Sequence, residues 1–113
     1  MNKKENIFKQ LKNIFKDSQS NLADEYFRYL DNNILDDLIE YLFREVKKGN
    51  SKIKIQIPCP EEFVGLMYPV SKLLEYLKLK LSIPEGEHIV YYKTYYPYNE
   101  SSQCVYNFFL YLN

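Results

Sequence analysis

A chain of 113 residues is long enough for one hydrophobic core and too short for two, so we expect a single domain spanning residues 1–113. Hydrophobic residues make up 46% of the sequence and charged residues 27%, which excludes a wholly disordered chain. The acidic and basic residues balance to a net charge of zero, so strong nonspecific binding to nucleic acid is not expected.

The first segment, residues 1–17, has the pattern of a basic amphipathic helix. Its large apolar residues recur at helical spacing: Ile7, Phe8, Leu11, Ile14 and Phe15. Lysines occupy much of the remaining surface. Because so short a helix is marginal alone, we expect its apolar stripe to pack on the rest of the domain. Docking in a partner's groove and lying on an anionic membrane are the alternatives that the same pattern allows.

Residues 21–48 form an acidic helical segment. The turn-forming and capping residues at 17–21 predict an interruption before it, and Gly49 after two lysines predicts its end. Asp36, Asp37 and Glu40 fall opposite the apolar stripe, which favours an ordinary solvated face. In a functional interpretation, these carboxylates imitate nucleic-acid phosphates and occupy a basic channel of a partner protein.

Residues 51–113 predict a β-α-β-β-β portion. Polar and apolar residues alternate over residues 52–57, as in a strand with one wet face. A helix is expected from Pro60 to about Lys78, kinked or split at Pro69, and the alternation at residues 79–83 predicts another short strand. Residues 88–112 predict a long tyrosine-rich β-hairpin around a polar turn at residues 99–102.

The predicted fold class is α+β. About four helices pack on one face of a small, mostly antiparallel sheet of three to four strands that ends in the tyrosine-rich hairpin.

The hairpin also supplies the candidate contact surface, because both faces of its strands are aromatic. Strict alternation places Tyr91 and Tyr95 on one side with Lys93 between them, and a charged central position favours the solvated side. Tyr98, near the turn, completes this set of partner-binding candidates. The alternative is that the N-terminal helix covers this face and leaves no site.

Nothing in the sequence predicts catalysis, a metal site or a cofactor. Cys59 and Cys104 are the only cysteines and His88 is the only histidine, without the spacing of a zinc site. We expect free thiols. The absence of a signal peptide and of a membrane span predicts a cytoplasmic protein that does not bind membranes.

These features favour a small, non-catalytic, intracellular interaction protein. Because amino acids with AT-rich codons are abundant, we interpret it as an accessory protein of a phage or mobile element. It would bind and inhibit a host macromolecule through the tyrosine-rich sheet or the acidic helical face, or form a homodimer. The alternative is a nucleic-acid-binding module, with bases on the sheet tyrosines and phosphates on Lys52, Lys54, Lys80 and Lys93.

Overall fold

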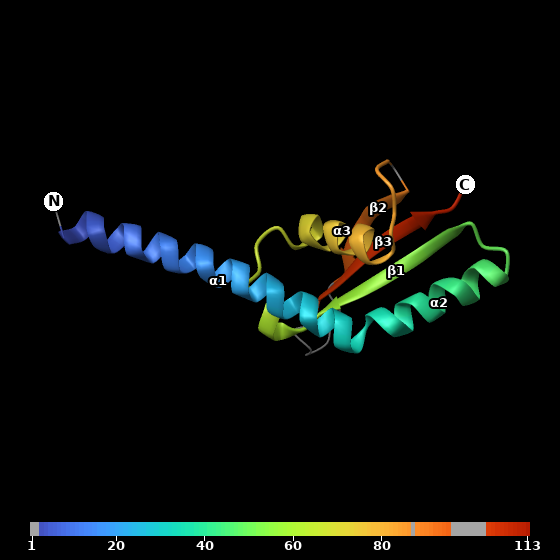
Figure 1. Cartoon of the computed structure of the whole chain (residues 1–113), viewed down its shortest axis with the longest axis horizontal. Helices are drawn as coiled ribbons and strands as arrows, with labels where there is room; N and C mark the ends of the chain where they lie inside the picture. Colours follow the sequence, from blue (N-terminus) through green and yellow to red (C-terminus); the bar gives the residue numbers. More distant parts are fainter. Residues whose placement is uncertain (1–2, 87, 96–103) are drawn as a thin grey trace.

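The computed structural model describes residues 3–86, 88–95 and 104–113, and in them the chain has the predicted α+β class (Figure 1). In chain order the elements are α1 (Lys3–Asn33), α2 (Leu35–Lys47), β1 (Lys52–Cys59), the short 3₁₀ helix η1 (Glu61–Phe63), α3 (Pro69–Lys80), β2 (Ile89–Tyr95) and β3 (Cys104–Tyr111). These described parts contain three α-helices rather than four, and three antiparallel strands.

The sheet has the strand order β1-β3-β2, so β3 pairs on both sides. The β2–β3 pairing confirms the predicted hairpin, although the expected turn at residues 99–102 lies outside the described residues. Ile55 of β1 lies opposite Phe108 of β3, and both are almost completely buried. Burial alternates along β1, which confirms one covered face and one wet face. The covered face forms a single core with residues of α1, α2 and α3.

The helix predicted over residues 1–17 runs on into the helical segment predicted from residue 21, so the break expected at residues 17–21 is wrong. Ser, Asp and Asn cost only about 0.5 kcal/mol each in a helix interior, and no Gly or Pro occurs before Gly49 to stop the helix. The helix ends at Asn33, where Ile34 departs from helical geometry with φ −123° and separates α1 from α2.

The N-terminal half of α1 projects from the domain, which contradicts the expectation that it packs on the core. The side chains of residues 6–18 are all exposed, and the first buried residue of the helix is Ala23. The molecule is therefore 65 Å long, with the N terminus at one end and the C terminus near the other (Figure 1). Its radius of gyration is 17.5 Å, against roughly 13 Å for a compact domain of this size.

The segment between β1 and β2 differs from the prediction in two places. Pro69 does split the expected helix, because it stands at the first position of α3 and Tyr68 before it is left-handed with φ 55°. No strand forms at residues 79–83. There α3 continues to Lys80, and the Ile83 N–H donates to the Lys78 carbonyl at 2.9 Å, which closes the helix end.

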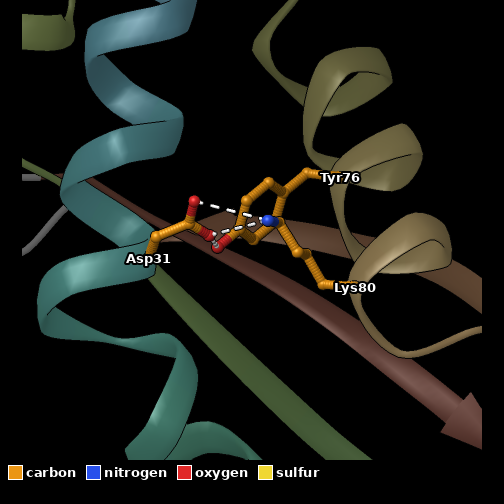
Figure 2. Close-up of polar contacts among 3 residues, drawn as sticks. All are labelled: Asp31, Tyr76 and Lys80. Atoms are coloured by element: carbon orange, nitrogen blue, oxygen red, sulfur yellow. Dashed lines mark hydrogen bonds and ion pairs between the residues drawn. The ribbon is translucent and has the colours of Figure 1, made fainter.

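A polar link joins the end of α1 to α3 (Figure 2). The Tyr76 hydroxyl donates to Asp31 Oδ1 at 2.6 Å, and Lys80 Nζ lies 3.3 Å from both carboxylate oxygens. Burial and the Asp31 carboxylate both raise the pKa of Tyr76 above its ordinary value. Asp31 thus accepts the hydrogen bond of the Tyr76 hydroxyl, and Tyr76 is only 4% exposed.

Replacing Asp31 by Ala is expected to lower the free energy of unfolding by about 1–2 kcal/mol, because the nearly buried Tyr76 hydroxyl then lacks its acceptor. Asp31→Asn keeps an acceptor oxygen and should cost less. Urea denaturation measures both. Asp36→Ala, at an exposed position of α2, is the matched control and should change stability by less than about 0.5 kcal/mol. Equal stability of the Asp31→Ala and Asp36→Ala variants would contradict this role.

Candidate functional site

An exposed apolar stripe lies on the projecting half of α1, and we call it the N-terminal stripe. It consists of Ile7, Phe8, Leu11, Ile14 and Phe15, each between 53% and 62% exposed. Within the described residues no other element covers it. Several large apolar side chains gathered on one exposed face mark a contact site more often than scattered ones do.

The stripe faces the same side of α1 as the core contacts. Phe8 and Phe15 are followed at seven-residue intervals by Leu22 and Tyr29, and these two pack against the core. Gln19 fixes the helix where it leaves the domain. Its amide nitrogen donates to the Gly65 carbonyl at 2.9 Å, and its amide oxygen accepts from the Met67 N–H at 2.8 Å. The direction of the stripe is therefore set by the domain.

The second feature lies on the sheet face turned away from the helices. It combines cations with rings and is called the open-face cluster: Lys52, Lys54, Tyr92, Phe109 and Tyr111. The Lys52 ammonium lies 4.3 Å from the centre of the Phe109 ring, and the Lys54 ammonium lies 5.6 Å from that of Tyr92. Beside them the Gln56 amide donates to the side-chain oxygen of buried Asn107 at 3.2 Å.

A β-bulge at Tyr92 overturns the predicted orientation of Tyr91. Tyr91 pairs with Phe108 and packs against the core, with its ring edge-on to Phe108 at 5.7 Å, so it does not face outward. The extra residue, Tyr92, is half exposed. Beyond the bulge Lys93 pairs with Asn107 and Tyr95 with Val105. Tyr98 lies outside the described residues.

The acidic candidates are exposed on α2. Asp36, Asp37 and Glu40 occupy its first half, as the helical pattern predicted. Asp37 also borders a small hollow between α2 and β1, together with Lys54 and Gln56. In the described part of the chain no three His, Cys, Asp or Glu side chains form a group that could hold a metal ion. The contact role of these acids remains a prediction.

An apolar groove lies at the end of the molecule opposite the N terminus, and we call it the distal groove. Its volume is about 570 Å³, and its walls include Leu42, Phe43, Val46, Ile83, Pro84 and Leu112. Phe43 is 64% exposed and Leu112 is 52% exposed, so the walls are only partly shielded from water. The sequence placed Phe43 and Val46 on the apolar face of α2 without showing that the domain leaves this end open.

The two thiols lie opposite each other on the covered face of the sheet. Cys59 pairs with Cys104, and both are free and buried. Burial, with a further contribution from Cys104, raises the pKa of Cys59 to about 12. The Cys59 thiol is thus protonated at neutral pH and is a weak nucleophile there. His88, the only histidine in the sequence, lines the distal groove, whose lining includes neither cysteine.

Comparisons with protein-family models, with curated proteins and with solved structures found no match to this chain. Across the described residues, none of the helices combines the length and apolar content needed to cross a membrane.

Proposed function

We propose that this chain is a non-catalytic interaction protein that binds another protein through the N-terminal stripe of α1. The observation that carries the proposal is the projecting half-helix with five large apolar side chains, each more than half exposed. The proposed contact surface is thus the N-terminal half of α1, in place of the predicted tyrosine-rich sheet. The proposal keeps the class of protein and the intracellular location expected from the sequence.

The N-terminal stripe leaves a large apolar area in contact with water. At exposures of 53–62%, the five side chains present roughly 500 Å² of apolar accessible surface. Burial of that area is worth about 12 kcal/mol at 25 cal/mol per Å². Association costs about 4–15 kcal/mol in lost freedom, so the stripe is large enough to dominate a contact but needs a complementary surface.

The direction of the stripe favours a protein partner over a lipid surface. A flat bilayer must approach the stripe from the side on which Leu22 and Tyr29 meet the core, where the domain itself obstructs it. A protein with a groove can fit between the helix and the domain. Lys12 borders the stripe, with its ammonium 4.9 Å from the centre of the Phe8 ring, and suits a partner with acidic groups at its rim.

Photocrosslinking in the source cell tests the proposal. Phe15 is replaced by a photoreactive phenylalanine analogue, and the same analogue at Tyr92 of the open face is the matched control. We expect a protein adduct of discrete mass from position 15 that disappears when Leu11→Glu is added. Adducts from position 92 alone would contradict the proposal and return the contact surface to the sheet. Crosslinks to lipid from position 15 would contradict it as well.

A second candidate function is binding of single-stranded nucleic acid on the open-face cluster. The specific observation is that two lysines and three aromatic rings gather on the sheet face opposite the buried core, where residues 52 and 54 of β1 are exposed. Bases stack on exposed rings of such sheets while lysines meet phosphates. The two lysines already lie over all three of these rings, so a base must displace them. This candidate is therefore the weaker one.

Titration of a labelled single-stranded oligonucleotide is expected to show weak binding. Two phosphate contacts, by Lys52 and Lys54, predict only about a sevenfold loss of affinity between 50 and 200 mM salt. The double variant Lys52→Ala/Lys54→Ala should abolish that salt dependence, whereas Lys72→Ala on α3 should leave it unchanged. Submicromolar binding with a steep salt dependence would contradict the expectation and promote nucleic acid to the leading function.

A further inference from the structure

We infer that the partner of the N-terminal stripe is a second copy of this chain, and that the stripe of each copy docks in the distal groove of the other. This inference rests on the proposed function and names its partner. The two surfaces lie at opposite ends of a 65 Å molecule, so no single chain can satisfy both.

The shape of the groove suits a helix. It is bounded on one side by Ile39, Phe43 and Val46 of α2 and on the other by residues 80–84, at the end of α3 and just after it. Its floor includes Ile53 of β1 and Leu110 of β3, on the sheet face that the helices cover. Helices lie over this face on either side of the groove, and an amphipathic helix laid between such walls is a common mode of recognition. Its volume of about 570 Å³ accommodates a few large side chains, such as the two phenylalanines of the stripe.

Charge complements the apolar fit. Residues 1–16 contain five lysines and one glutamate, whereas residues 17–45 contain eight acids and two arginines. Asp36 and Glu40 precede Phe43 by seven and three residues, so these exposed carboxylates flank Phe43 on the polar side of α2, outside the groove lining, which itself includes Lys80. The lysines beside the stripe therefore meet carboxylates along the α2 edge of the groove, next to Phe43. The predicted acidic candidates acquire a specific role, since they steer the lysines of the second copy.

The apolar area available for burial and the closed symmetry of a dimer both favour a reciprocal pair. The stripe alone offers roughly 500 Å² per copy, less than the roughly 800 Å² per partner of a standard interface. Each copy of a reciprocal pair also buries its groove, where Phe43, Val46 and Leu112 are between 45% and 64% exposed. The exposed residues 6–18 span about 20 Å of helix. Two copies placed side by side and antiparallel bring each stripe to the other's distal end, which closes the assembly at two.

Direct pairing of the two stripes is the competing arrangement, and charge disfavours it. Lys12 borders the stripe, so two stripes packed together bring the Lys12 ammonium groups of both copies into one apolar contact. That arrangement also leaves the distal groove of both copies open to water.

A mixing experiment with the full chain tests the inference. Leu11→Glu breaks the stripe, Phe43→Glu breaks the groove, and Leu79→Glu is the matched control because Leu79 is 76% exposed and lies outside the groove lining. Sedimentation equilibrium at about 100 μM should give twice 13.6 kDa for the wild type and the control. Each broken variant should dimerise about a thousandfold more weakly, because a symmetric pair contains the lost contact twice.

The two broken variants mixed in equal amounts should form a heterodimer, because one intact stripe then meets one intact groove. Failure of the mixture to dimerise overturns the inference. A wild-type chain that stays monomeric, or whose mass keeps growing with concentration, overturns it too. If Phe43→Glu dimerises normally while Leu11→Glu does not, the groove is refuted and the proposed function stands. If both variants dimerise normally, stripe-mediated self-association is refuted, and the crosslinking experiment decides the proposed function separately.

Discussion

Replacing Tyr26 by Ala is expected to lower the free energy of unfolding by about 3–5 kcal/mol. Tyr26 is completely buried where α1 crosses the sheet, with its ring centre 5.0 Å from that of Phe63. Its hydroxyl donates to the Pro58 carbonyl at 2.7 Å and ties the helix to β1. The variant loses the ring contacts and the hydrogen bond together and leaves a cavity. In a domain of marginal stability, such a loss populates the unfolded state measurably.

Urea denaturation in dilute solution measures this change, and two further variants separate its causes. Tyr26→Phe keeps the ring and should cost only about 1–2 kcal/mol for the unmet Pro58 carbonyl. Leu79→Ala, at a position 76% exposed, should change stability by less than about 0.5 kcal/mol. A loss below about 1 kcal/mol for Tyr26→Ala would show that α1 is not anchored through this ring.

Stability is expected to fall steeply above pH 10. Burial raises the pKa of Tyr26 and of Tyr76 above the ordinary 10.0, and that of Cys59 from 9.0 to about 12. The unfolded chain therefore releases these protons at a lower pH than the folded chain, so the folded state binds more protons from about pH 9 upward. Under that condition the free energy of unfolding decreases as pH rises. Each buried group contributes up to about 1.4 kcal/mol per pH unit, or roughly 4 kcal/mol per unit for all three above pH 10.

Urea midpoints between about pH 8 and pH 11 test this slope. Tyr76→Phe removes one titrating hydroxyl, so its decline should be shallower by about 1.4 kcal/mol per pH unit than that of the wild type. Leu79→Ala, at an exposed position that carries no titrating group, serves as the control whose slope should not change. A free energy of unfolding that is constant or rising between pH 10 and 11 would show that these hydroxyls ionise freely in the folded state.

The sequence predicted elements well where periodicity and helix-stopping residues agreed. The alternation at residues 52–57 became β1, the split at Pro69 was observed, and the hairpin formed between β2 and β3. The break expected at residues 17–21 does not occur, because residues that are weak helix formers do not by themselves end a helix. Within this stretch the Gln19 side chain stabilises the helix position through hydrogen bonds to Gly65 and Met67, which lie far away in sequence. Contacts of that range leave no local signal.

The candidate site was predicted only in part, for two physical reasons. A bulge shifts alternation by one residue, and a run of aromatic residues such as Tyr91 and Tyr92 gives no polar marker of where the shift occurs. Helical periodicity identified the N-terminal stripe. Such a stripe predicts a contact, but it does not tell whether the contact lies within the chain or with another molecule. The distal groove arises where α2 and residues 80–84 stand apart, which depends on tertiary packing alone.

The bulge at Tyr92 also bears on how the sheet avoids aggregation. With the order β1-β3-β2, no other strand within the described residues pairs with the outer edges of β1 and β2, and flat edges of this kind recruit strands from other molecules. The bulge distorts the edge of β2, while β1 carries Lys52, Lys54 and Pro58, residue types that discourage further strand addition. Backbone-mediated growth is thereby opposed at both ends of the sheet. A chain protected in this way can carry an exposed apolar helix for specific recognition without forming fibres from its strands.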